Sequence, residues 1–213
     1  MYHDPDFGML PYLLPAQPVC IDVGANAGQS VHSIKRARPE AIIHSFEPNP
    51  EFSEKLQALR QQYQNVNVYS VGLGARDAKI TFHVPVINGI RYLEETTMRL
   101  ESLQEPWILD RFKQRGGEVR FESFDQNIVT GDSFGFKPDL IKIDVEGVES
   151  EVVQGFASTI RQHAPILLIE NGDWHRLAPI IAGLGYVPMM PDENATKLIP
   201  FSGQRTNTFY IKA

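Results

Sequence analysis

The sequence of 213 residues predicts an α/β protein with a doubly wound, Rossmann-like sheet that is mostly parallel. Short apolar runs alternate with amphipathic segments from residue 19 onward, which is typical of βαβ units. The last two apolar runs, 186–191 and 208–212, are joined only by an irregular stretch that is too short for a helical crossover. The final pair of strands is therefore predicted to be antiparallel.

The first elements follow from proline content and from the spacing of apolar residues. Residues 1–18 contain four prolines and are predicted to form an N-terminal arm rather than a helix. Beyond the arm, apolar residues recur first at the spacing of a buried strand and then at that of a helix. This pattern predicts strands at 19–23, 41–46 and 66–71, with helices at 29–37 and from about 51 to 63.

The alternation stops in the middle of the chain and resumes near residue 139. The later part predicts strands at 139–144 and 166–170 and helices at 148–162 and 174–184. Residues 82–120 form a mid-chain insert, with extra strands expected at 80–84 and 119–124. Because long insertions in compact domains are often lids or binding loops, we expect the insert to be a substrate cap on a single domain of residues 19–213.

Charge and cysteine content narrow the class of protein. The formal net charge of −6 argues against a nucleic-acid partner, and the basic cluster Lys35, Arg36 and Arg38 is expected on a solvated helix face. Cys20 is the single cysteine and is expected in the core. The sequence shows no signal-peptide pattern and no transmembrane segment, so a cytoplasmic location is expected, with a homo-oligomer left open.

A strand, a glycine-rich turn and a helix start follow one another in residues 19–30, and such a junction binds ligands at the carboxyl end of a sheet. Dinucleotides and S-adenosylmethionine both fit it. The dinucleotide fingerprint requires glycine where this chain has Asn26 and Gln29, which argues against an NAD-linked oxidoreductase. The carboxylate of Asp22 would repel a pyrophosphate and attract the cationic groups of S-adenosylmethionine. The turn therefore favours S-adenosylmethionine as the cofactor.

A second acidic residue, Glu47, ends the strand predicted at 41–46. At this position of a doubly wound fold, a carboxylate can accept both hydroxyl groups of a ribose. The residue therefore supports a nucleoside ligand without distinguishing NAD from S-adenosylmethionine.

Four segments form a specific combination: I-D-V-G-A-N-A-G-Q-S (21–30), S-F-E-P-N-P (45–50), L-I-K-I-D-V-E-G-V-E-S-E-V-V-Q-G (140–155) and I-L-L-I-E-N (166–171). Together they resemble the FkbM-type family of S-adenosylmethionine-dependent methyltransferases, from residue 19 onward. The resemblance implies a seven-stranded methyltransferase sheet with an antiparallel last strand. It also implies methyl transfer, commonly to a hydroxyl group of a sugar, glycolipid or natural product.

The resemblance also assigns site residues by their position in the motifs. The cofactor-binding residues that it implies are Asp22, Gly24, Ala25, Asn26, Gly28, Glu47, Pro48 and Asp144, with Glu146 and Gly147 in the second motif. The arm and the insert match no pattern of the family. The acceptor is therefore not identified by the resemblance.

Acidic residues follow two adjacent predicted strands, and we take Asp144, Glu146 and Glu170 as the candidate catalytic residues. They could act as a general base or, with Asn171, as oxygen ligands of Mg²⁺. The metal-assisted alternative is not favoured, and no metal ligands are assigned. Lys142 either pairs with an acid or only buries its stem, whereas Glu149 and Glu151 are expected on a solvated helix face.

These observations predict an S-adenosylmethionine-dependent methyltransferase that acts on oxygen. The acceptor is expected to be a small molecule or a glycan, bound with the help of Arg91, Tyr92, Arg99 and Trp107 in the insert. A non-catalytic module that keeps the fold is the alternative. Labelled methyl transfer distinguishes the two.

Overall fold

The computed structural model describes residues 1–145, 147–203 and 205–213. The chain divides into two compact units. The first unit comprises residues 1–77 and 129–213, and the second comprises residues 78–128. Each unit is described below by itself.

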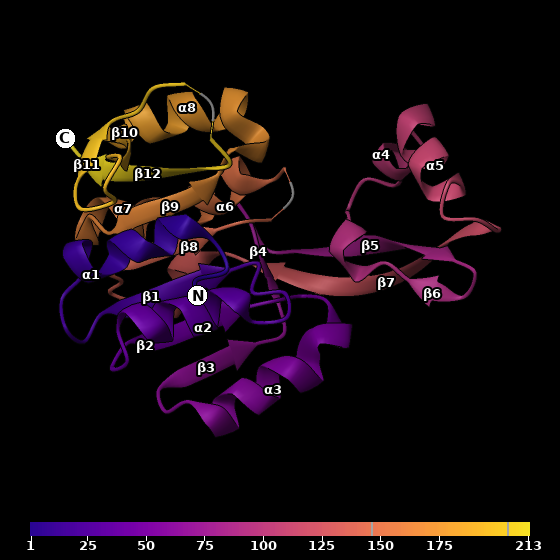
Figure 1. Ribbon diagram of the computed structural model, residues 1–213, viewed down its shortest axis with the longest axis horizontal. Helices are drawn as coiled ribbons and strands as arrows, with labels where there is room; N and C mark the ends of the chain where they lie inside the picture. Colours follow the sequence, from indigo (N-terminus) through magenta and orange to yellow (C-terminus); the bar gives the residue numbers. More distant parts are fainter. Residues whose placement is uncertain (146, 204) are drawn as a thin grey trace. The chain divides into compact units, whose positions relative to one another are not determined.

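The first unit is built on an eight-stranded sheet with the order β11-β10-β12-β9-β8-β1-β2-β3 among the described residues (Figure 1). Five neighbouring strands, from β3 to β9, are parallel, and β12 is antiparallel to both β9 and β10. The strands are β1 (Val19–Val23), β2 (Ile42–Phe46), β3 (Val66–Tyr69), β8 (Leu140–Ile143), β9 (Ile166–Glu170), β10 (Tyr186–Pro191), β11 (Leu198–Pro200) and β12 (Asn207–Lys212).

The predicted fold class is confirmed, including the mostly parallel order and the antiparallel last strand. The count of seven strands is wrong, because a short strand, β11, forms within the stretch that was expected to be irregular and pairs with β10. Its three residues, Leu198–Pro200, end in a proline at the edge of the sheet, where a missing backbone donor is tolerated.

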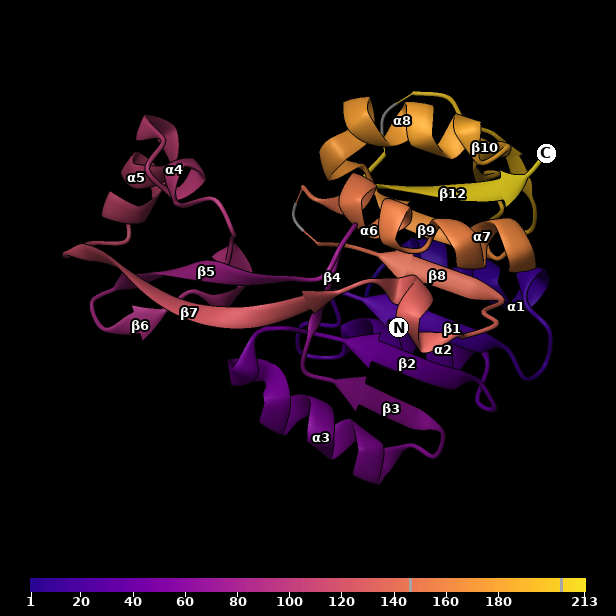
Figure 2. The same cartoon turned by 180° about the vertical axis from the view of Figure 1, so that it is seen from behind.

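Helices cover the two faces of this sheet. The helices α2 (Gln29–Ala37) and α3 (Ser53–Gln62) connect the first three strands. The other side is covered by α6 (Glu149–Gly155), α7 (Ala157–His163) and α8 (Trp174–Gly183) (Figure 2). These helices pack apolar residues such as Val153, Ile160 and Leu177 against the strands. Cys20 is fully buried, as predicted. Within the described residues, no helix has the length and apolar character needed to cross a bilayer.

The N-terminal arm is helical, so the prediction of an arm without helix is wrong. It forms the 3₁₀ helix η1 (Pro5–Met9) and the short helix α1 (Leu10–Leu13). Proline is compatible with both because it lies in the first turn, where the backbone N–H has no partner in the helix. Phe7, Met9 and Leu10 are buried, and apolar burial therefore holds this segment in place.

The basic cluster on α2 is also not the solvated face that was expected. Lys35 is buried, and Arg38 donates hydrogen bonds to the carbonyl oxygens of Pro11 and Leu14 in the N-terminal segment. Arg36 alone of the three is exposed. Two of the three cationic side chains at the end of α2, Lys35 and Arg38, therefore bind backbone carbonyl groups instead of facing solvent.

The second unit is a β-ribbon with two helices. The long strand β5 (Ala78–Ile87) pairs antiparallel with β7 (Val119–Val129) and with β6 (Ile90–Arg91), so the extra strands expected at 80–84 and 119–124 are confirmed and longer than predicted. Between them lie η3 (Leu93–Glu95), α4 (Leu100–Leu103) and α5 (Pro106–Lys113). A small apolar core of Ile87, Leu103 and Phe112 stabilises the unit. The role of residues 82–120 as a substrate cap stays a prediction.

Candidate functional site

The glycine turn after β1 is held against both neighbouring strands. The N–H groups of Gly24 and Ala25 both donate to the carbonyl oxygen of Phe46, at 3.0 and 3.1 Å. Gly24 has a φ of +77°, and a Cβ atom placed there would lie 1.8 Å from the carbonyl oxygen of Asp144. Only glycine allows the turn to pass so close to the end of β8.

The helix α2 begins directly after this turn. Gly28 is its N-cap, with a φ of +90°, and a Cβ atom there would meet Leu59 of α3 at 2.1 Å. Asn26 also has positive φ, and its side-chain oxygen accepts from the N–H of Ala27 at 2.6 Å. The motif glycines and Asn26 are therefore required by the turn itself. They bring a helix N-terminus to the carboxyl end of β1.

Glu47 joins two loops at the end of β2. One carboxylate oxygen accepts from the N–H of Asn26 at 2.8 Å and the other from the N–H of Asn49 at 2.8 Å. Burial raises the pKa of Glu47, and the two backbone hydrogen bonds partly oppose that rise. Each carboxylate oxygen has a second lone pair, so a fixed pair of acceptors is available for two ligand hydroxyl groups. Pro48 follows Glu47 and precedes the 3₁₀ helix η2 (Pro50–Phe52).

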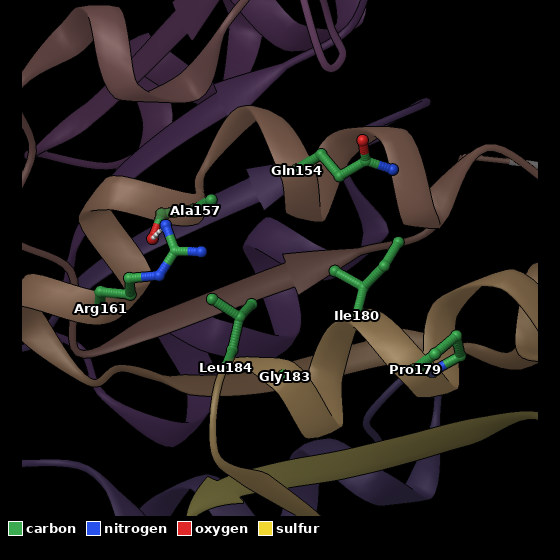
Figure 3. A pocket seen from close by; sticks show the side chains of 7 residues that line it. All are labelled: Gln154, Ala157, Arg161, Pro179, Ile180, Gly183 and Leu184. Carbon is green, nitrogen blue, oxygen red and sulfur yellow. Dashed lines mark hydrogen bonds between the residues drawn. The ribbon is translucent and has the colours of Figure 1, made fainter.

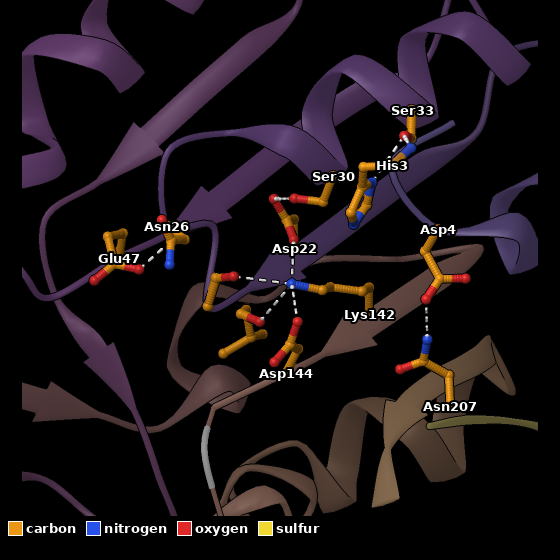
Figure 4. Close-up of polar contacts among 12 residues, drawn as sticks. His3, Asp4, Asp22, Asn26, Ser30, Ser33, Glu47, Lys142, Asp144 and Asn207 are labelled. Atoms are coloured by element: carbon orange, nitrogen blue, oxygen red, sulfur yellow. Dashed lines mark hydrogen bonds and ion pairs between the residues drawn. The ribbon is translucent and has the colours of Figure 1, made fainter. Parts of the chain in front are cut away.

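A buried lysine of β8 connects the carboxylate of Asp22, within β1, with that of Asp144, directly after β8 (Figure 4). The ammonium of Lys142 lies 3.3 Å from Asp22 and 3.6 Å from Asp144, and it donates to the carbonyl oxygen of Gly24 at 2.8 Å. Burial alone would lower the pKa of Lys142, but the two carboxylates raise it above its ordinary value. The lysine is therefore held in its charged form.

Asp22 does not lie open to a ligand. Its side chain is 0% exposed, and one of its oxygens accepts from the hydroxyl groups of Ser30 at 2.6 Å and Ser45 at 3.3 Å. Its charge is balanced by Lys142 at the other oxygen. Because Lys142 compensates this charge, Asp22 acts on a bound ligand less strongly than its carboxylate alone would predict. Asp144, with a side chain that is 42% exposed, is the more accessible of the two carboxylates.

The N-terminal segment reaches this same edge of the sheet, which the sequence did not predict. His3 contacts the hydroxyl of Ser33 through its ring Nδ1 at 2.9 Å (Figure 4). Its ring also packs against the ring of Phe7. Asp4 accepts from the side-chain amide of Asn207 at the start of β12, at 2.7 Å. Burial and the positive charge of Lys142 lower the pKa of His3. No local sequence pattern signals this placement, because its partners lie 30 or more residues away.

The remaining acidic candidates have different surroundings. Glu170 is the last residue of β9 and is half-buried, whereas Glu146 lies outside the described residues. Glu149 is buried and accepts from the N–H of Gly147 at 2.9 Å, so its expected place on a solvated face is wrong. A carboxylate in the first turn of α6 satisfies a backbone donor there. Glu151 is exposed as expected.

The structure gives the metal-assisted alternative no support at Asn171. The side-chain oxygen of Asn171 accepts from Thr208 at 3.0 Å, and its amide nitrogen donates to the carbonyl oxygen of Arg205 at 2.8 Å. The amide therefore ties β9 to β12. In the described part of the chain, no three His, Cys, Asp or Glu side chains come together as metal ligands would.

The four predicted acceptor residues all lie in the second unit and contact different partners. Arg91 forms an ion pair with Glu122 at 2.6 Å, and Arg115 stacks on the ring of Tyr92. Arg99 is the N-cap of α4, and Trp107 of α5 is 62% exposed. Their role in acceptor binding stays a prediction.

A separate hollow of about 410 Å³ lies at α6, α7 and α8, away from the residues described above (Figure 3). It is lined by Gln154, Ala157, Arg161, Pro179, Ile180, Gly183 and Leu184. Gln154 lies within the motif segment 140–155, but on α6 and not at the carboxyl end of a strand, and the other lining residues lie outside the four motif segments. The hollow is therefore distinct from the candidate site.

The parallel sheet, its antiparallel last strand and the glycine turn at the end of β1 define a protein with the methyltransferase-type Rossmann-like fold. The chain belongs to the FkbM methyltransferase domain family, whose sequence model matches residues 22–187. This confirms the family that the four motifs indicated. The match begins at Asp22 and includes the Glu47 turn and the segment around Lys142 and Asp144.

Two curated relatives and one solved structure are similar to this chain. Methyltransferase 1 of Beauveria bassiana is 28% identical over 147 residues, which cover 66% of this chain and 59% of that protein. The 2-O-methyltransferase NoeI of Sinorhizobium fredii is 26% identical over 152 residues, which cover 67% of this chain and 59% of that protein. The chain thus spans about three fifths of the length of these relatives.

The crystal structure of a methyltransferase FkbM from Methylobacillus flagellatus superposes with a TM-score of 0.62 at 16% identity, covering 96% of this chain and 47% of that one. This likeness shows the fold.

Proposed function

We propose that this chain transfers a methyl group from S-adenosylmethionine to a hydroxyl oxygen of a sugar, glycolipid or natural product. Family membership supports methyl transfer, and the name of NoeI describes that relative as a 2-O-methyltransferase. The observation that supports the donor most directly is Glu47, whose two carboxylate oxygens are each fixed by a backbone N–H. S-adenosylmethionine would supply an activated methyl group bound to a sulfonium.

The residues at the carboxyl edge fit the parts of this donor. Glu47 would accept hydrogen bonds from the two ribose hydroxyl groups, because each of its oxygens has a lone pair left. The turn of Gly24, Ala25, Asn26 and Gly28 would approach the donor through its backbone. Asp144 would attract the cationic methionine end. These roles divide the donor among the carboxyl ends of three neighbouring strands, β2, β1 and β8.

The remaining task is to orient the acceptor and to remove its proton. Glu170 ends the strand next to that of Asp144, so its carboxylate would accept the proton that the acceptor hydroxyl loses. Much of the rate enhancement would come from holding the hydroxyl oxygen in line with the methyl group. Glu146 stays a candidate for the same role.

Calorimetric titration with S-adenosylhomocysteine and with NAD tests the donor. We expect micromolar binding of S-adenosylhomocysteine, no binding of NAD, and an affinity about tenfold lower or more in Glu47→Gln, since each lost ribose contact to a charged group costs about 1.5–3 kcal/mol. Glu54→Gln is the matched control, because Glu54 is an exposed residue of α3, and it should bind S-adenosylhomocysteine as the wild type does. Transfer of labelled methyl to a panel of hydroxyl-bearing glycans and small molecules then tests turnover.

The outcomes separate the rival functions. A folded protein that binds neither compound would contradict the proposal. Binding of S-adenosylhomocysteine without methyl transfer to any acceptor would favour the non-catalytic module. Binding of NAD alone would favour the oxidoreductase.

A further inference from the structure

Lys142 differs from an ordinary core lysine in what surrounds its ammonium group. It is 5% exposed and lies within 3.6 Å of two carboxylates and two backbone carbonyl oxygens. The carbonyl groups belong to Val23 and Gly24, the last residue of β1 and the first of the glycine turn. The lysine thus contacts the turn itself and the acidic residue on each side of it.

The charges in this cluster do not balance. Asp22 and Asp144 contribute two negative charges and Lys142 one positive charge, so one negative charge remains. Asp22 is wholly buried, and in the described part of the chain Lys142 is the cation that contacts its second oxygen. Asp144 is partly exposed. The net charge is therefore available at Asp144, on the side open to solvent.

We propose that Lys142 is a positioning residue that cancels the buried charge of Asp22, so that the cationic methionine end of the donor meets one uncompensated negative charge, that of Asp144. This inference rests on the proposed function and assigns a role that the motif comparison did not. Lys142 acts through Asp22, Asp144 and the carbonyl of Gly24, without contact to the reacting atoms. The site would then prefer cationic over neutral ligands through the one negative charge at Asp144.

Removing the ammonium exposes the donor site to a second charge whenever Asp22 is ionised. In Lys142→Met, Asp22 loses its counter-ion in a fully buried position, where the charged form of a carboxyl group is costly. Among the described residues, the other charged or titratable groups that interact with Asp22 are His3 of the N-terminal segment, Cys20 of β1 and Glu47 after β2, and Asp144 after β8 shares Lys142 with it. None of these supplies a permanent cation in place of Lys142.

The test compares the affinities of S-adenosylmethionine, which carries a sulfonium, and S-adenosylhomocysteine, which does not, between pH 6 and 9. The preference for the sulfonium is the ratio of the affinity for S-adenosylmethionine to that for S-adenosylhomocysteine. We expect this ratio to rise with pH in Lys142→Met by about fivefold relative to wild type, because one negative charge is added several ångströms from the sulfonium. The double variant Asp22→Asn/Lys142→Met should lose this rise. Asp22→Asn alone leaves Lys142 to neutralise Asp144 and should weaken the preference for the sulfonium.

Lys35→Met is the matched control, because Lys35 is also a buried lysine but contacts only carbonyl groups. It should keep the wild-type ratio at every pH, and it also corrects for titration of the ligands themselves. If Lys142 had only a structural role, Lys142→Met would bind both ligands more weakly by the same factor. An unchanged ratio of the two affinities in Lys142→Met and in Asp22→Asn would overturn the proposal. If Lys142→Met does not fold, the affinity ratio of Asp22→Asn alone tests the proposal: a weaker preference for the sulfonium supports it, and an unchanged preference overturns it.

The failure of this proposal is distinguishable from that of the proposed function. If the wild type binds neither compound, both fail. If the wild type binds both and the ratios do not move, only the role of Lys142 fails.

Discussion

Two buried lysines lie at opposite ends of the parallel sheet, and the difference between them shows where this fold places its chemistry. Lys35 donates to the carbonyl oxygens of Pro39, Ala41 and Gln64, which precede β2 and β3. Lys142 contacts Asp22 and Asp144 at the other end. Burial lowers the pKa of Lys35, whereas the neighbouring carboxylates raise that of Lys142 despite its burial.

The amino edge therefore uses charged side chains to complete backbone hydrogen bonds. Asp139 likewise accepts from the N–H of Val19 at 2.8 Å. At the carboxyl edge, charged side chains contact one another around a glycine turn, next to partly exposed Asp144. The same residue type thus stabilises the fold at one edge and sets the charge of a candidate site at the other.

The largest effect should come from removing each lysine in turn. Lys142→Met leaves the buried carboxylate of Asp22 without a counter-ion, which should lower the free energy of unfolding by about 3–5 kcal/mol. Lys35→Met leaves three carbonyl groups without a donor and should cost about 1–3 kcal/mol. Urea unfolding at pH 7 measures both. Equal losses in the two variants would remove the distinction between the edges.

A smaller effect should appear in the pH dependence of stability at Glu47. Because the pKa of Glu47 is raised on folding, its folded form binds more protons than the unfolded chain does. The free energy of unfolding of the wild type, relative to Glu47→Gln, should therefore fall as the pH rises from the unfolded pKa through the raised folded pKa. Urea unfolding of both proteins at intervals from pH 4 to 8 measures the free energy of unfolding of the wild type minus that of Glu47→Gln. An increase of this value with pH would contradict the prediction.

The smallest effect is expected at Asp139, the amino-edge counterpart of Glu47. Asp139→Asn keeps an acceptor for Val19 but weakens the hydrogen bond, so it should cost about 0.5–1.5 kcal/mol. The affinity for S-adenosylhomocysteine should stay at the wild-type value in the same calorimetric assay. A loss of affinity there would show that the two edges are not independent.

Much of the fold could be predicted because it depends on local patterns. The strand at 19–23 and the strand at 166–170 form at the predicted bounds, since each is a short apolar run between turn residues. Glu47 could be placed for the same reason, because it directly follows a strand. The helicity of the N-terminal arm was missed, because proline content was weighed without its position in the first turn.

The sequence by itself determined the doubly wound order, the glycine turn and the acidic residues at the strand ends, because these follow from spacing along the chain. The tertiary structure decided how those acids are used. The pairing of Asp22 with Lys142 joins residues 120 positions apart, and His3 reaches the site from the N-terminal segment. Such contacts depend on strand order and packing, and a charge in a sequence does not reveal which other charge will cancel it.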